Sequence, residues 1–154
     1  AKPASQWIAL SRDRTRAENT NGDTPDDIDA AVFQGVVIGD APIPRGPHGA
    51  YFELVVEKTR PEWSEGLVIG VTARAPSSLV GHAFNTADDV PESWSFGYDG
   101  QAHLSGEHIP EDEDMFEIDW NPQELQVGDR VGLLVTNEGE ARVCVNGSLV
   151  ASQE

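Results

Sequence analysis

The sequence Tyr-Phe-Glu-Leu-Val-Val at residues 51–56 decides the fold class. Successive side chains of a β-strand point to opposite faces, so Phe52, Leu54 and Val56 share one face. The other face carries the tyrosine and the glutamate. This alternation predicts a strand with one buried face and one exposed face.

The next apolar stretch, Gly-Leu-Val-Ile-Gly-Val at residues 66–71, is apolar on both faces. It predicts a central strand that is covered on each side. Glycine within a strand lets a ring or a backbone approach closely, so we expect Gly70, Gly97 and Gly132 to lie opposite aromatic side chains.

The rest of the chain predicts the same fold class. No segment keeps the i, i+3, i+4, i+7 apolar spacing of an amphipathic helix, whereas short alternating or continuous apolar runs recur. Strands are expected at residues 6–10, 31–38, 50–58, 66–74, 93–98, 101–104, 115–119, 130–136, 141–146 and 148–151. Asp99-Gly100 and Asn146-Gly147 are typical of tight hairpin turns. The sequence therefore predicts an all-β fold, with loops at 11–29, 39–49 and 75–92 that are available for function.

The composition fits one domain over residues 1–154 with a strong negative charge. The chain has 154 residues, 27 acidic against 10 basic side chains and a net charge of −17. Such a field repels phosphate backbones and anionic lipids, so we expect no nucleic acid partner and no membrane binding. The acidic runs at 23–29, 88–92 and 111–117 lie in expected loops, where they keep the domain soluble or attract basic peptides or divalent cations.

A single cysteine, Cys144, excludes an intramolecular disulfide and indicates a reducing, cytoplasmic (intracellular) environment. No apolar stretch is long enough to span a bilayer, and the start of the chain has no signal-peptide pattern. Because the chain begins at Ala1 instead of a methionine, we expect it to be a fragment of a longer, multidomain protein.

Signatures of catalysis are absent from the sequence. It has no Gly-x-Ser-x-Gly elbow, no phosphate-binding glycine loop and no His-Glu-x-x-His motif. Cys144 lies between two valines and is expected to be a buried structural thiol. His103 and His108 lie near several acids, but exposed loop histidines beside acids rarely bind a metal. We therefore expect a protein that is not an enzyme and has no cofactor or metal.

The four tryptophans, Trp7, Trp63, Trp94 and Trp120, lie near the ends of expected strands. There a ring either seals the core, which is the more common role, or lines a binding groove. Trp63 and Trp94 are the best candidates for a groove, because each adjoins a polar loop that contains proline or glycine.

Several sequence blocks occur in a characteristic order. They are Phe-Gln-Gly-Val-Val-Ile-Gly at 33–39, Tyr-Phe-Glu-Leu at 51–54, Trp-Ser-Glu-Gly-Leu-Val-Ile-Gly-Val-Thr at 63–72, Leu-Gln-Val-Gly-Asp-Arg-Val-Gly at 125–132, Glu-Gly-Glu at 138–140 and Val-Asn-Gly at 145–147. Together these blocks resemble the neuralized homology repeat (NHR domain). The match spans most of the chain, and the ordered set is specific although each block alone is weak.

The resemblance implies a SPRY-like, concanavalin-like β-sandwich of two antiparallel sheets. It also implies a non-catalytic substrate-recognition or adaptor module that binds a short segment of a partner protein, often within a ubiquitin ligase. Some relatives bind phosphoinositides, which disagrees with the net charge of −17. The chain holds no RING cysteines, so a ligase activity would come from other parts of a parent protein.

The sequence differs from the family pattern at the end of the chain. Relatives continue past the hairpin at 146–147 with further strands, whereas this chain ends at Glu154. We therefore expect that the last strands are lacking, that a sheet edge is exposed, and that a homodimer pairs through this edge.

The loops around Trp63, Arg74, Ser77 and Trp94 form the expected peptide-binding groove. Arg74 lies at the end of a predicted strand and is able to donate hydrogen bonds to a peptide carboxylate or carbonyl. Two other functions stay open: a lectin-like carbohydrate-binding sandwich in which tryptophan rings stack on sugars, and a purely structural scaffold domain.

Overall fold

The computed structural model describes residues 2–3, 8–20, 35–59, 66–82, 84, 86–98, 100–105 and 115–153. Trp7 and Trp63 lie outside the described residues, as do the expected strand segments 6–7 and 31–34. The described residues form β-strands, two short 3-10 helices and no α-helix, so the all-β prediction is confirmed. They contain no helix long and apolar enough to cross a membrane.

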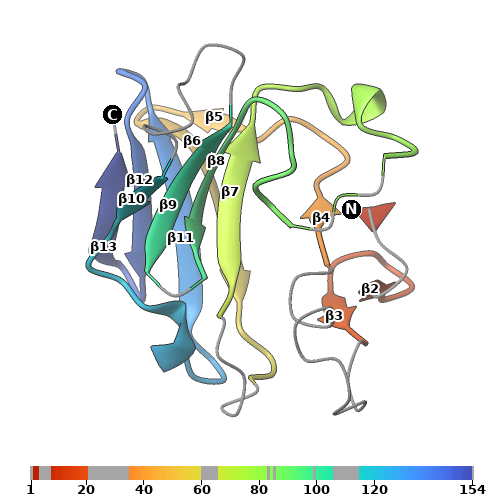
Figure 1. The fold of residues 1–154 in the computed structure, drawn as a ribbon, viewed down its shortest axis with the longest axis horizontal. Helices are drawn as coiled ribbons and strands as arrows, with labels where there is room; N and C mark the ends of the chain where they lie inside the picture. The colour runs from red at the N-terminus through yellow and green to blue at the C-terminus, as the bar shows by residue number, and fades with distance from the viewer. Residues whose placement is uncertain are drawn as a thin grey trace.

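Two antiparallel sheets form a β-sandwich (Figure 1). The four-stranded sheet has the order β10-β9-β8-β7, and its strands are β7 (Val68–Thr72), β8 (Ser93–Gly97), β9 (Gln101–Ser105) and β10 (Met115–Glu117). The five-stranded sheet has the order β13-β12-β11-β6-β5, and its strands are β5 (Arg45–Gly46), β6 (Gly49–Val55), β11 (Arg130–Thr136), β12 (Ala141–Val145) and β13 (Ser148–Gln153). Two small sheets pair β1 (Lys2–Pro3) with β4 (Val37–Ile38), and β2 (Ile8–Leu10) with β3 (Ala17–Asn19).

The main core lies between the two large sheets. Its largest fully buried side chains are Phe96, Leu133, Val131 and Val143, which come from β8, β11 and β12. The inward residues of β6 pack against them, as the alternation at 51–56 predicts, while the outward Tyr51 is 46% exposed. Each fully buried side chain of this kind contributes roughly 1.5–3 kcal/mol. The predicted sandwich of two antiparallel sheets is therefore confirmed.

Most of the expected strands are present with shifted ends. The strand at 130–136 has the predicted bounds, whereas the one expected at 66–74 is limited to β7. The short strands β1, β3 and β5 were not predicted, because they contain too few apolar residues to give a periodic signal. The hairpin turn at Asn146 and Gly147 is confirmed by their positive φ angles of 51° and 82°.

The prediction that residues 66–71 form a central strand is wrong for the described part of the fold. β7 is the last strand of its sheet, and Gly70 is exposed. The pattern of apolar side chains shows which faces of a strand are buried, but it does not show whether another strand pairs with each of its edges. The expected aromatic neighbour is confirmed for Gly132, which lies against the Tyr51 ring, and is wrong for Gly70 and Gly97, which lie against backbone atoms of the paired strand.

The segment between η1 (Pro76–Ser78) and β8 packs back onto the fold. Its buried residues Leu79, Phe84 and Val90 form a second apolar cluster with residues of the 36–38 segment. The Ser95 hydroxyl of β8 donates to Asp88 Oδ1 at 2.9 Å. A predicted acidic loop thus contributes its own small core.

Candidate functional site

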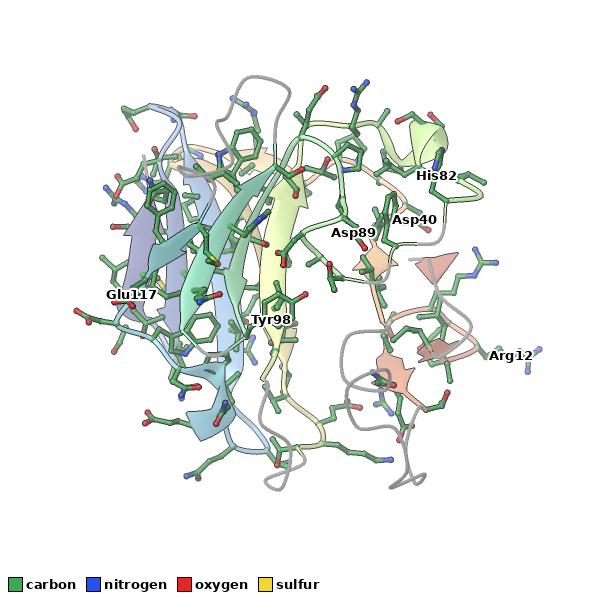
Figure 2. All side chains as sticks on the ribbon, viewed as in Figure 1. Arg12, Asp40, His82, Asp89, Tyr98 and Glu117 are labelled. Carbon is green, nitrogen blue, oxygen red and sulfur yellow. The ribbon has the colours of Figure 1, made fainter. Side chains whose placement is uncertain are left out.

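The two ends of the four-stranded sheet carry different loops. The register of β7 and β8 pairs Thr72 with Ser93 at one end and Val68 with Gly97 at the other. We call the first end, with residues 74–82, 84 and 91–92, the Arg74 end. The second end, with residues 100–101 and 117–124, is the Trp120 end. In Figure 2, His82 lies to the right of β7, below η1, and Glu117 lies on the opposite side of the molecule, on β10.

Arg74 follows β7, and hydrogen bonds fix the backbone around it. The Arg74 N–H donates to Thr72 Oγ1 at 3.1 Å, and the Thr72 hydroxyl donates to the Pro91 carbonyl at 2.8 Å. The guanidinium Nη2 lies 2.7 Å from Glu92 Oε1, and the two side chains are 42% and 37% exposed. An exposed pair of this kind contributes about 0–1 kcal/mol. An incoming acceptor therefore replaces Glu92 at a small cost.

The backbone of Glu92 is in an unusual conformation. Its φ angle is 50°, in the left-handed region that non-glycine residues rarely adopt. Its carbonyl accepts a hydrogen bond from the Ala73 N–H at 2.9 Å, which ties it to the end of β7. The Glu92 backbone is therefore fixed at the end of β7, next to Arg74.

A small depression of about 130 Å³ lies beside Arg74. It is lined by Arg74, Ser78, Leu79, His82, Phe84 and Pro91. Leu79 and Phe84 are buried, and the His82 ring stacks on the Phe84 ring with centroids 6.0 Å apart. This arrangement offers one small apolar pocket next to a hydrogen-bond donor.

The structure brings together only some of the predicted groove residues. Ser77 is exposed on η1, three positions after Arg74. Trp94, by contrast, is partly buried and packs against the main core. Trp63 lies outside the described residues, and the next described residue after it, Gly66, donates to the Tyr98 carbonyl at the Trp120 end of β7.

The Trp120 end carries a larger and more polar concavity. Its volume is about 440 Å³, and it is lined by Gly100, Gln101, Glu117, Ile118, Asp119, Trp120, Asn121 and Glu124. None of these lining residues is Lys or Arg. The Asn121 side chain caps η2 (Pro122–Glu124) by accepting from the Gln123 N–H at 2.9 Å. Trp120 is only 7% exposed, so its ring belongs to the core and leaves little surface for stacking.

Asp129, in the loop from η2 to β11, has a pKa below its usual value. The Asn146 side chain donates to Asp129 Oδ1 at 2.9 Å, and the Gln126 N–H donates to Oδ2 at 2.8 Å. Both bonds favour the charged carboxylate. The loop is therefore held in place by an ionised side chain.

Residues with metal-binding or redox chemistry are scattered. Among the described residues, no group of three or more His, Cys, Asp and Glu side chains is arranged to hold a metal ion. His103 Nδ1 lies 3.7 Å from Asp88 Oδ1, and His108 lies outside the described residues. The prediction that Cys144 is buried is wrong: it is half-buried, because it alternates with the inward Val143 and faces out from β12.

Sequence reasoning missed the apolar lining of the depression and the partner of Arg74. Leu79, Phe84 and Pro91 occur in a predicted acidic loop, and their irregular spacing gives no periodic signal. Glu92 reaches Arg74 only because β7 pairs with β8 in one register. No local sequence pattern indicates either of them.

A protein-family model described as Neuralized matches residues 5–153 of the chain. The match covers nearly the whole chain, including both large sheets and both of their ends. No curated protein matches the chain.

Proposed function

The chain belongs to the Neuralized family of protein-interaction domains, and we propose that it binds a short segment of a partner protein at the Arg74 end. The observation that supports this most directly is the depression of about 130 Å³ beside a guanidinium in an exposed ion pair. A bound peptide places one apolar side chain in the depression and one carbonyl or carboxylate oxygen on Arg74. In a longer protein, this makes the domain a non-catalytic substrate-recognition or adaptor part, such as that of a ubiquitin ligase.

The chemistry of the Arg74 end favours it over the Trp120 end. Binding sites for peptides and small ligands combine apolar surface with a few oriented polar groups. Leu79, Phe84 and Pro91 supply the apolar part, and Arg74 supplies the donor. The apolar residue that enters the depression is expected to be flanked by Lys or Arg. The net charge of −17 attracts such basic residues electrostatically as the segment approaches.

A peptide-display selection against the purified domain tests the proposal. Enriched peptides are retested on Arg74→Ala and on the matched control Arg142→Ala. Arg142 is also an exposed arginine, 44% accessible, with Nη2 2.5 Å from Glu140 Oε2, but it lies on the other sheet. We expect Arg74→Ala to weaken binding roughly tenfold or more, because a charge-assisted hydrogen bond is lost. Equal affinity in the wild type and Arg74→Ala would contradict the proposal, as would equal losses in both variants.

The other predicted groove residues are replaced by alanine and tested in the same way. Ser77→Ala is expected to weaken binding only about twofold to threefold, because Ser77 is exposed and does not line the depression. Trp63→Ala and Trp94→Ala are compared by affinity and by melting temperature. Since Trp94 packs against the core, we expect its replacement to lower the melting temperature more than Ser77→Ala does.

A further inference from the structure

We propose that the partner segment binds in an extended conformation, as an added strand along the free edge of β7. This inference rests on the proposed function and names the class of ligand. Within the described part of the chain, β7 pairs with β8 alone and ends the four-stranded sheet. An edge strand presents a row of backbone donors and acceptors that a further strand is able to pair with.

The register identifies the residues whose backbone groups face the free edge. In an antiparallel pair, hydrogen-bonded and non-hydrogen-bonded positions alternate. The Ala73 N–H donates to the Glu92 carbonyl at 2.9 Å, which makes positions 73 and 92 a hydrogen-bonded pair. The backbone groups of Val71 and Ile69 therefore face β8, and those of Val68, Gly70 and Thr72 face outward.

Among the described residues, the sequence of β7 has none of the features that usually protect edge strands. Such features are short length, charged side chains, proline and bulges. β5 has only two residues, and β10 has three, one of them Glu117. β13 is longer but lies opposite a break in register at Val143 and Cys144. β7 has five residues, Val-Ile-Gly-Val-Thr, with no charge, no proline and an unbroken register with β8.

The edge leads directly to the Arg74 end. A segment paired with Val68, Gly70 and Thr72 reaches Arg74 and the depression at the end of the strand. Its backbone donates to and accepts from β7, and one of its carbonyl or carboxylate oxygens accepts from the guanidinium. Since the pairing uses backbone atoms, the sequence is restricted mainly at the residue that enters the depression.

The net charge of the chain indicates which kind of segment pairs with this edge. Two copies of a chain with a net charge of −17 repel each other, so the charge disfavours pairing of β7 with itself and disagrees with the homodimer that the sequence resemblance led us to expect. A partner segment of apolar and uncharged residues flanked by Lys or Arg is attracted by the same charge. The occupant is therefore an extended, basic-flanked segment of another protein.

Val68→Pro tests the inference, with peptides selected on the wild-type domain. Proline removes the outward N–H of Val68, and edge positions whose N–H faces solvent tolerate proline. The matched control Val68→Thr keeps both the N–H and the branched shape. We expect Val68→Pro to weaken peptide binding roughly tenfold and Val68→Thr to change it less than about twofold.

The outcomes separate this inference from the proposed function. If Val68→Pro binds like the wild type while Arg74→Ala loses affinity, strand addition is wrong and the proposed function stands. If Arg74→Ala binds like the wild type, the proposed function fails. Amidating the carboxyl terminus of the peptide shows which oxygen accepts from Arg74. The peptide loses affinity on amidation only if its terminal carboxylate is the acceptor.

A second measurement applies if Val68→Pro does not fold. Peptides N-methylated at one position at a time are titrated into the wild-type domain. Strand addition requires losses of affinity at every second residue, because alternate N–H groups face β7. Equal losses at consecutive residues, or none at all, would overturn it.

Discussion

The Arg74 end and the Trp120 end lie at opposite ends of the same sheet and have opposite chemistry. The Trp120 end has the larger concavity, about 440 Å³ against about 130 Å³, but it is lined by carboxylates and amides. The Arg74 end is smaller, and it combines buried apolar side chains with an accessible guanidinium.

Volume alone therefore does not identify the binding end. A peptide gains affinity by burying an apolar side chain, and it gains orientation from a polar group that is readily available. The carboxylates at the Trp120 end are exposed to solvent, whereas the Arg74 guanidinium forms an exposed ion pair of small energy with Glu92.

The largest effect is expected at Gly97, in the hairpin of the Trp120 end. Its φ angle is 142°, and an added Cβ would lie 2.1 Å from the Leu67 carbonyl oxygen. We expect Gly97→Ala to lower the free energy of unfolding by roughly 3 kcal/mol or more, because backbone atoms must move. Urea unfolding measures the change.

Gly132→Ala is the comparison for Gly97→Ala. Its added Cβ would lie 2.3 Å from Tyr51 Oη, and that ring is 46% exposed and is able to move outward if its hydrogen bond to Glu53 breaks. We expect a loss of only about 1 kcal/mol. Equal losses in the two variants would show that the close approach at Gly97 is not a backbone constraint.

An intermediate effect is expected from the cap of η2. Asn121→Ala removes the acceptor for the Gln123 N–H and is expected to cost about 1 kcal/mol of stability. Asn121→Asp keeps an acceptor and should stay within a few tenths of the wild-type value. Both should bind Arg74-end peptides with unchanged affinity. A loss of affinity in Asn121→Ala at a temperature where it is folded would show that the two ends are coupled.

The smallest effect is the pH dependence from Asp129. Hydrogen bonds from Asn146 and Gln126 hold its folded-state pKa below the ordinary value of 3.8. A lowered pKa contributes stability above the unfolded-state pKa, and this contribution is lost as the pH falls through the folded-state pKa. Below about pH 4, thermal melts should therefore show a shallower loss of stability in Asp129→Asn than in the wild type. Identical slopes would contradict this assignment.

The sequence predicts the faces of the strands well and their edges poorly. The alternation at 51–56 and the hairpin at Asn146–Gly147 are local patterns, and the structure confirms both. The edge position of β7 and the pair of Arg74 with Glu92 depend on which strands are neighbours, which no local pattern encodes. Arg74 was found because it follows an apolar strand, whereas Leu79 and Phe84 were missed because their spacing is irregular.

The measurement that most directly tests the account is an amide chemical-shift map of the isotope-labelled domain as a selected peptide is added. We expect the largest changes along Val68–Thr72 and at Arg74, Ser78 and Glu92, with little change at the Trp120 end. Changes that centre on Gly100, Gln101 and residues 117–124 would place the binding surface at the acidic end and contradict the account.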